Sequence, residues 1–361
     1  MTAIHRRLLD WYDANRREMP WRDHPDPYAV WVSEIMLQQT QVETVRGYFA
    51  RFVQAFPTVA ALAAAPQQQV LKLWEGLGYY TRARNLQRAA QQIVTQGGAL
   101  PRDAAGWAEL PGVGPYTAAA IASICFGVPA PVVDGNVIRV FARYRGWDDD
   151  FRKPAARARL ASWLQPHIAV SGRPGDFNQA MMDLGATCCT PRTPGCDRCP
   201  LRGGCVARRE CRQAALPMRP ARKAVPTRTA VAVLARDAAG RVLLAQRADD
   251  GLLGGLWELP SRASGDAPTA RDAARVLRVA AGLRATHMET RGCFTHVFTH
   301  FKQVWHLFEA TGLKMTAEKQ NPPSARFMMP DELPLTTLTR RVLDQSASYK
   351  TPRSQACTGT S

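Results

Sequence analysis

The spacing of apolar positions changes once along the chain. From Ile4 to about Arg208, apolar residues recur every three or four positions and turn dipeptides separate the segments, which is typical of packed helices. Alternating apolar and polar runs, which are typical of strands, are nearly absent there. Residues 1–208 are therefore predicted to form an all-α domain.

A basic segment that contains prolines follows the helical part. Between Cys211 and Arg228 the chain has five arginine or lysine residues, three prolines and no acidic residue. Prolines favour extended backbone and like charges repel one another, so we predict a linker at residues 209–228. At the other end of the chain, residues 346–361 are polar and short of large apolar side chains, which predicts a disordered tail.

Between the linker and the tail, the pattern is that of strands with one helix. Thr229 to Ala235 and Arg241 to Gln246 are predicted strands, residues 269–280 have helical spacing, and further strand-like runs surround Phe294 to Phe308. Residues 229–345 are therefore predicted to form a mixed α+β domain.

The composition agrees with two domains and indicates an anionic partner. A chain of 361 residues can bury two separate cores. It has 47 Lys and Arg against 30 Asp and Glu, a net charge of +17, which favours a polyanion, with nucleic acid as the first candidate. The alternative is that the arginine content reflects genome composition and no ligand.

Neither a membrane nor an oxidising compartment is indicated. Residues 1–21 mix arginines with acidic residues and lack the apolar core of a signal peptide, and no apolar run has transmembrane length. Nine cysteines in a chain of this length do not make a disulfide scaffold. We therefore expect a soluble cytoplasmic protein.

Four cysteines at a compact spacing predict a metal centre. Cys189, Cys196, Cys199 and Cys205 are separated by six, two and five residues, so one short loop can carry four thiolates to a metal. A 4Fe-4S cluster is the preferred occupant. Tetrahedral zinc is the alternative, although structural zinc sites usually bring two close pairs of ligands, and only Cys196 and Cys199 form one here.

Two segments are candidates for contacts with DNA. In the first, Gly112 and Gly114 join two helical segments and allow positive φ and close backbone approach, so that N–H groups at a helix start can bind phosphate. A connector between packed helices is the alternative. In the second, Tyr79 and Tyr80 lie next to arginines, a combination that suits stacking on bases or wedging into a duplex. The alternative for either tyrosine is packing in a helical core.

Two carboxylates are candidates for acid–base chemistry. Glu34 is predicted to share one stripe of an apolar helix with Gln38 and Gln41, and apolar neighbours would raise its pKa until it can act as a general acid near neutrality. The alternative is a surface glutamate. Asp134 precedes a predicted helix and is first of all an N-cap, whose amides hold the carboxylate ionised. One protonated and one ionised carboxylate are what glycosidic bond cleavage requires.

Residues 31–41, 110–120, 132–139 and the four cysteines together resemble the helix-hairpin-helix DNA glycosylase superfamily with an iron–sulfur cluster. Within it, the chain resembles adenine DNA glycosylases of the MutY type over nearly its whole length. The resemblance implies base excision repair, in which adenine mispaired with 8-oxoguanine or guanine in double-stranded DNA is flipped out and its N-glycosidic bond is hydrolysed. It also implies a 4Fe-4S cluster on the four cysteines, and we expect a monomer.

The same resemblance implies roles for individual residues. Glu34 matches the acid that protonates adenine N7, and Asp134 matches the carboxylate that stabilises the sugar cation. The other matched residues are Tyr116 and Asn136 around the sugar and Asp134, Trp21 and Arg22 in the pocket wall, and Gln39 and Tyr79 inserted into the helix near 8-oxoguanine. In the related endonuclease III type, a lysine at the place of Tyr116 attacks the sugar. A phenol cannot form a Schiff base, so we expect little or no lyase activity.

The second domain resembles a Nudix fold. Where Nudix hydrolases carry magnesium-binding glutamates, this chain has Val276, Val279 and Ala280, so pyrophosphate hydrolysis is not expected. In this family the domain instead recognises 8-oxoguanine, and Phe298-Thr299-His300 matches its Phe-Ser-His loop. Thr299 keeps the hydroxyl of the usual serine and adds a methyl group. The alternative is that Thr299 and His300 are ordinary strand residues that face solvent.

Three other functions stay open. The chain could be a thymine or other mismatch glycosylase of the same superfamily, which the choice between T:G and A:8-oxoguanine pairs would separate. A noncatalytic iron–sulfur protein that binds damaged DNA would release no adenine. A nucleotide-pool hydrolase would use the second domain, and the missing glutamates count against it.

Overall fold

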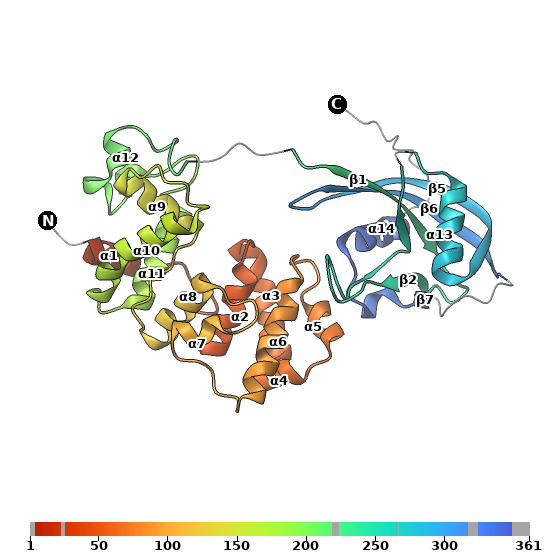
Figure 1. The fold of residues 1–361 in the computed structure, drawn as a ribbon, viewed down its shortest axis with the longest axis horizontal. Coiled ribbons are helices and arrows are strands. Elements are labelled where there is room, and N and C mark those ends of the chain that lie inside the picture. Colours follow the sequence, from red (N-terminus) through yellow and green to blue (C-terminus); the bar gives the residue numbers. More distant parts are fainter. Residues whose placement is uncertain (1–3, 23–25, 219–223, 266, 317–323, 349–361) are drawn as a thin grey trace. The chain divides into compact units, whose positions relative to one another are not determined.

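The computed structural model describes residues 4–22, 26–218, 224–265, 267–316 and 324–348. The chain divides into two compact units, whose elements are labelled in Figure 1. Unit 1 comprises residues 1–65 and 85–222, and unit 2 comprises residues 66–84 and 223–361. Most of the predicted tail, and residues 219–223 of the predicted linker, lie outside the described residues.

Unit 1 is helical, which confirms the predicted all-α class. Its helices are α1 (Ile4–Asn15), α2 (Pro27–Leu37), α3 (Val42–Ala55), α4 (Val59–Ala64), most of α6 (Thr81–Thr95), α7 (Ala104–Ala108), α8 (Pro115–Phe126), α9 (Gly135–Arg145), α10 (Pro154–Ala169), α11 (Pro174–Asp183) and α12 (Val206–Arg209). A π-helical turn (Leu184–Cys188) follows α11, and 3₁₀ turns occupy Cys196–Arg198 and Arg202–Gly204. Prolines open α2, α8, α10 and α11, where the missing N–H has no intrahelical partner to lose.

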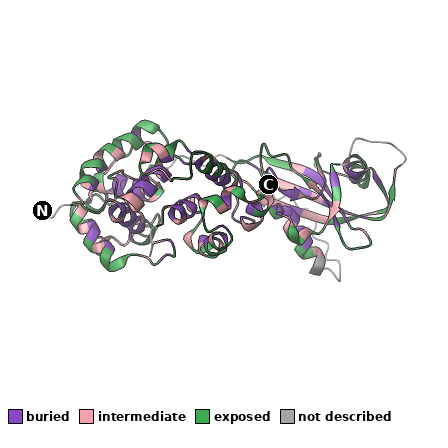
Figure 2. Ribbon diagram, turned by 90° about the horizontal axis from the view of Figure 1, so that it is seen from below, coloured by how far each residue is buried: buried purple, intermediate pink, exposed green. Residues whose placement is uncertain are grey.

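The core of unit 1 surrounds two helices that are apolar on nearly every side. Eight residues of α2 and seven of α8 are buried. Figure 2 shows buried residues of the whole molecule in purple. A second cluster joins α1, α9, α10 and α11 around fully buried Leu8, Phe141 and Phe177. A polar side chain on α2 or α8 is therefore desolvated wherever it lies. Among the described residues, no helix is long and apolar enough to cross a bilayer.

Unit 2 contains two sheets and is mixed α+β, as predicted. Four strands pair in the order β4-β1-β6-β5, and three in the order β3-β2-β7. The strands are β1 (Thr227–Ala235), β2 (Val242–Gln246), β3 (Trp257–Glu258), β4 (Ser261–Ala263), β5 (Leu283–Val297), β6 (Lys302–Met315) and β7 (Ala325–Met328), and the helices are α5 (Gln67–Leu73), α13 (Ala270–Ala281), α14 (Thr337–Ser348) and the first turn of α6.

The two faces of β1 explain its unbroken apolar run. Ala230, Ala232 and Leu234 pack with residues of α14, whereas Val231 and Val233 pack with residues of α13. Successive side chains of a strand point to opposite faces, so a strand that is covered on both sides has no polar positions in its centre. The α13 helix starts with a capping box between Thr269 and Asp272.

Candidate active site and cysteine cavity

A cavity in unit 1 with about 700 Å³ of empty volume gathers most of the predicted catalytic residues, and we call it the carboxylate cavity. Its predicted lining residues are Trp21, Arg22, Glu34, Tyr116, Asp134 and Asn136. They come from the segment after α1, from α2, from α8 and from the start of α9. Two acidic groups a hundred residues apart in sequence thus line one space.

Glu34 lies inside the apolar helix α2, and its side chain is buried. The residue is only 5% exposed, so the alternative of a surface glutamate is wrong. Its Oε2 accepts a hydrogen bond from the Tyr116 hydroxyl at 3.0 Å. Burial raises the pKa of Glu34 to about 7, although the Tyr116 bond and the charge of Arg22 act in the opposite direction. A substantial fraction of this carboxyl group is therefore protonated at neutral pH.

The predicted polar stripe on this helix is wrong. The α2 helix ends at Leu37, and Gln41 is already the N-cap of α3, so Gln38 and Gln41 do not continue the face that carries Glu34. The side chain of Gln38 instead donates to the Thr117 hydroxyl at 3.1 Å. The chain leaves helical geometry at Gln38, whose ψ is 110°, and Gln39 follows with left-handed backbone at φ 58°.

Asp134 is the N-cap of α9. Its Oδ1 accepts from the Val137 amide at 2.7 Å, and its Oδ2 accepts from the Asn136 side chain at 2.9 Å. The cap was expected to dominate and hold the carboxylate ionised, yet burial has the larger effect and raises the pKa of Asp134, while the bonds from Val137 and Asn136 lower it. The sequence could not reveal this burial, because the surrounding groups come from other helices.

The two carboxyl groups therefore differ in their hydrogen-bond donors. Glu34 accepts a hydrogen bond from the neutral Tyr116 phenol, and burial raises the pKa of that phenol well above its usual value. Asp134 accepts from a helix amide and from a carboxamide, which both favour the anion. The cavity thus offers a proton donor and a separate anionic acceptor.

Arg139 connects Asn136 to the segment that carries the first cysteine. Its Nη2 donates to Asn136 Oδ1 and to the Gly185 carbonyl, both at 2.8 Å, and its Nε donates to the Cys189 carbonyl at 2.8 Å. Gly185 has to be a glycine here, since a Cβ atom would lie 2.5 Å from the Cβ of Asn136. The orientation of Asn136, and through it of Asp134, therefore depends on the loop that follows α11.

Sequence reasoning missed several residues of this cavity, namely Arg17, Gln179, Met182 and the adjoining Asp183. Asp183 is fully buried and binds two guanidinium groups, Arg17 at 2.6 Å and Arg22 at 2.7 Å. Burial alone would raise the pKa of Asp183, but the bonds from both arginines lower it below its usual value. No local pattern pointed to Asp183, because the burial of the polar residues in α11 is visible only in the structure.

The predicted helix-hairpin-helix connects α7 and α8. Gly112 has φ 78°, and a Cβ atom there would lie 2.7 Å from Asn85 Cβ. The position therefore needs glycine both for its positive φ and for its lack of a side chain. Gly114, in contrast, has φ −86° and serves as the N-cap of α8. Nothing lies within 4 Å of its absent Cβ. The exposed amides at the start of α8 are thus accessible to a phosphate.

Gln39 and Tyr79, the two residues matched to insertion beside the lesion, share an unusual backbone. Both have positive φ, 58° and 49°, and both side chains are exposed. Such backbone is strained in residues other than glycine and occurs often at binding sites. Of the two neighbouring tyrosines, Tyr80 is buried and accepts a bond from the Gly76 amide, so the core alternative applies to Tyr80 and not to Tyr79.

The segment Phe298-Thr299-His300 forms the exposed turn between β5 and β6. Phe298 stacks on Phe301 with ring centroids 4.7 Å apart, and its amide donates to the Phe301 carbonyl. Thr299 and His300 are exposed and precede β6, so they are not strand residues. Within unit 2, the Tyr79 hydroxyl lies 3.0 Å from Thr299 Oγ1.

The Nudix-like helix α13 has no acidic cluster. Val276 is buried, Val279 is exposed, and the one acidic residue of α13, Asp272, is used in the capping box. Among the described residues, no group of three or more His, Cys, Asp or Glu side chains is arranged to hold a single metal ion.

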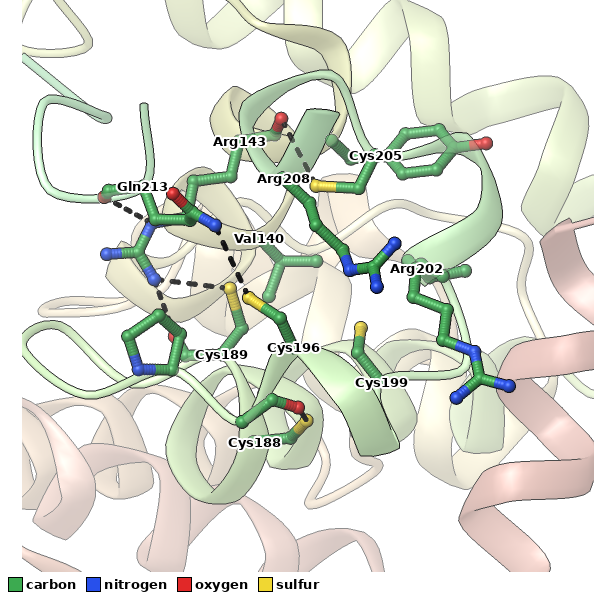
Figure 3. A pocket seen from close by; sticks show the side chains of 14 residues that line it. Val140, Arg143, Cys188, Cys189, Cys196, Cys199, Arg202, Cys205, Arg208 and Gln213 are labelled. Carbon is green, nitrogen blue, oxygen red and sulfur yellow. Dashed lines mark hydrogen bonds between the residues drawn. The ribbon is translucent and has the colours of Figure 1, made fainter. Parts of the chain in front are cut away.

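All four predicted cysteine ligands line a second cavity, which we call the cysteine cavity (Figure 3). Arg143 is 2% exposed and donates to Cys189 Sγ at 3.4 Å, to the Thr190 carbonyl at 2.7 Å and to the Gln213 carbonyl at 2.9 Å. Gln213 Nε2 approaches Cys196 Sγ at 3.8 Å. Four thiols around one space, with buried and nearby arginines to balance thiolate charge, fit a multi-iron cluster, whose ligands surround a larger volume than those of one ion. Cys188, which no motif assigned, lines the same space.

Comparisons with known proteins agree with both units. A family described as HhH-GPD superfamily base excision DNA repair protein matches residues 32–166, and the NUDIX domain family matches residues 230–345. An adenine DNA glycosylase from Homo sapiens is 36% identical, over 99% of this chain and 76% of that protein. Among solved structures, a thermostable thymine-DNA glycosylase is 29% identical, with a TM-score of 0.52 over 57% of this chain and 95% of its own. A trapped endonuclease III–DNA covalent intermediate is 25% identical, with a TM-score of 0.50 over 57% and 94%.

Proposed function

Because the chain belongs to the adenine DNA glycosylases of the HhH-GPD superfamily, which act in base excision DNA repair, we propose that it removes adenine paired with 8-oxoguanine or guanine in duplex DNA. The observation that carries the proposal is the carboxylate cavity, where a buried Glu34 and a capping Asp134 face one space. Hydrolysis of an N-glycosidic bond needs a proton on the leaving base and an anion beside the sugar cation.

In the proposed reaction the adenosine leaves the helix and enters the carboxylate cavity. Glu34, with a pKa of about 7, donates its proton to N7 and makes adenine a neutral leaving group. Asp134 stabilises the oxocarbenium ion, while Asn136 and the Val137 amide fix its orientation. Tyr116 hydrogen-bonds Glu34, and Trp21 and Arg22 form the wall against which the base would lie.

The opposite strand would be read elsewhere. Gln39 and Tyr79 are exposed on strained backbone that suits insertion between bases, and the Phe298-Thr299-His300 turn presents a hydroxyl and an imidazole for an 8-oxoguanine edge. The amides of Gly112 and Gly114 would bind backbone phosphate without reading sequence. DNA is the partner of this enzyme class, and the preference for these mispairs and a monomeric state are part of the proposal.

We propose that Cys189, Cys196, Cys199 and Cys205 hold a 4Fe-4S cluster in the cysteine cavity. The cluster would order the loop around residues 190–204 and supply no hydrolytic chemistry. Purified protein is expected to contain four irons and four sulfides per chain and to absorb visible light, and replacing Cys199 by serine should remove most of the iron. Protein that carries one zinc and no sulfide would contradict this assignment.

The direct test of the function is a single-turnover assay on four matched duplexes that differ in one pair. We expect free adenine from A:8-oxoguanine and from A:G, with no base release from T:G or from 8-oxoguanine:C. The similarity to a thymine-DNA glycosylase makes T:G the relevant competitor. Release of thymine without adenine would favour that second function, and tight binding without release would indicate a noncatalytic protein.

The enzyme is expected to leave the abasic strand intact. Tyr116, at the place of the lysine of lyases, offers a phenol that is neutral and cannot form an imine. Strand breaks should therefore require alkaline treatment, and borohydride should trap no enzyme on DNA. The variant Tyr116→Lys, assayed beside it, is expected to become trapped because it supplies an amine. Efficient trapping of the unaltered protein would overturn the monofunctional assignment.

A further inference from the structure

Unit 2 includes a short segment, residues 66–84, that lies within the HhH-GPD match. It comprises α5, the turn that carries Tyr79 and the first residues of α6. By sequence it belongs to the glycosylase part, yet by its contacts it belongs with residues 223–361. The segment thus joins a glycosylase motif to the Nudix-like fold inside one compact unit.

Polar contacts hold this segment at the start of α5 and in the first turn of α6. At its start, Gln68 donates to the Gly255 carbonyl and accepts from the Trp257 indole, both at 2.9 Å, so its amide is used on both sides. Gly255 has φ 78°, and a Cβ there would lie 3.0 Å from Leu71 Cδ1, which shows how closely the backbone approaches α5. Further along, Arg84 donates to the Gly254 carbonyl at 2.6 Å.

An ion pair with its own supports lies just after α5. The Glu75 carboxylate accepts from Arg340 of α14 at 2.9 Å and from Lys72 at 2.9 Å. Lys72 also donates to the Leu333 carbonyl at 3.0 Å, and Arg340 reaches Asp331 at 3.3 Å. The Glu75 side chain is only 16% exposed. This pair is therefore shielded more than an ordinary surface pair and is held by neighbours from both segments.

Glu75 directly precedes the turn of residues 76–79, which ends in the exposed, strained Tyr79. The turn contains Gly76 and Gly78 with positive φ, and its backbone is bonded by the side chains of Trp74, Tyr80 and Arg82. At the end of this turn, the Tyr79 hydroxyl lies 3.0 Å from Thr299 Oγ1, in the Phe298-Thr299-His300 turn. Two residues that are 220 positions apart thus form one surface. Arg82 supports the turn from α6, whereas the Glu75–Arg340 ion pair joins the residue just before the turn to α14.

We propose that the Glu75–Arg340 ion pair is a specificity-determining lock, which holds Tyr79 against the Phe298-Thr299-His300 turn so that both read the base opposite adenine together. The inference rests on the proposed function. Glu75 and Arg340 are positioning residues: neither lines the carboxylate cavity, and they act through Tyr79. Loss of the lock should lower the preference for 8-oxoguanine over guanine and leave the chemistry of adenine release intact.

The test compares single-turnover adenine release from A:8-oxoguanine and A:G duplexes for Arg340→Met and Glu75→Gln. Each variant is expected to lower the ratio of the two rates about three- to tenfold, with the A:G rate nearly unchanged, and the double variant should be no worse than either single one. Arg291→Met is the matched control, because Arg291 pairs with Glu289 and Glu309 within the β5–β6 sheet. Its ratio should equal that of the unaltered protein.

Hydrogen exchange gives a readout that does not depend on activity. Amides of residues 74–80 should exchange faster in both lock variants and not in Arg291→Met. An unchanged rate ratio, or an equal fall on both duplexes, would overturn the lock. Absence of adenine release by the unaltered protein would instead overturn the proposed function, and with it the premise of the lock.

Discussion

Glu34→Gln is expected to lower single-turnover adenine release by about 3 to 5 kcal/mol of transition-state stabilisation, or roughly 10²- to 10⁴-fold. Glutamine fills the same space and can still accept the Tyr116 hydrogen bond, but it has no acidic proton for the leaving base. The unaltered enzyme should lose activity as pH rises through about 7, because the pKa of Glu34 lies there and the protonated form is the active one. Rates measured from pH 5 to 9 test both statements.

Stability separates a catalytic loss from an unfolded variant. The pKa of Glu34 is raised in the folded protein, so this carboxyl group opposes folding increasingly as pH rises from its unfolded value of 4.5 to about 7. Glu34→Gln should then be at least as stable as the unaltered protein at pH 8. Glu43→Gln, the same change on a side chain that is 82% exposed, is the control and should keep full activity. Near-normal adenine release by Glu34→Gln would remove Glu34 from the mechanism.

Asp134→Asn is expected to cost a similar roughly 3 to 5 kcal/mol in the rate of adenine release. Asparagine is as good an N-cap as aspartate and can still accept from the Val137 amide, so α9 should persist. The variant loses the negative charge that faces the sugar cation. Its amide would also meet the Asn136 side chain, whose oxygen is already bonded to Arg139. The measurement is single-turnover release on the A:8-oxoguanine duplex with thermal unfolding beside it.

A second N-cap provides the matched control for this substitution. Asp103 caps α7 by accepting from the Gly106 amide at 2.8 Å and lies outside the carboxylate cavity. Asp103→Asn makes the same chemical change and should leave the rate nearly unaltered. Equal effects of the two substitutions would mean that Asp134 matters as a cap and has no direct part in catalysis.

Short sequence patterns predicted the features of this protein that depend on residues close together in the chain. The cysteine spacing predicted a metal-binding loop, and all four of those cysteines line the cysteine cavity. The change from helical to strand periodicity separated an all-α part from an α+β part, because each periodicity reflects which side of a single element is buried. The prediction of a polar stripe was wrong because it required one helix to run through Gln38 and Gln41, whereas α2 ends at Leu37.

Burial, and with it protonation, was decided by helices that are distant in sequence. The sequence predicted that Asp134 caps a helix, but the balance between the capping bonds and desolvation depends on the side chains that surround the cavity. No sequence motif marks Asp183 and its partners Arg17 and Arg22, because they are distant in sequence and only the fold brings them together. The same holds for residues 66–84, whose sequence matches one family and whose contacts belong to the other unit.

By itself, the sequence determined which side chains are available, where the helices and strands begin, and which loop carries four thiols, since these follow from neighbours a few positions apart. The tertiary structure alone decided that Glu34 and Asp134 line one cavity, that Glu34 titrates near neutrality and that Tyr79 lies beside Thr299. Solvent exclusion and contacts over a hundred residues or more set those properties, and no local pattern encodes them.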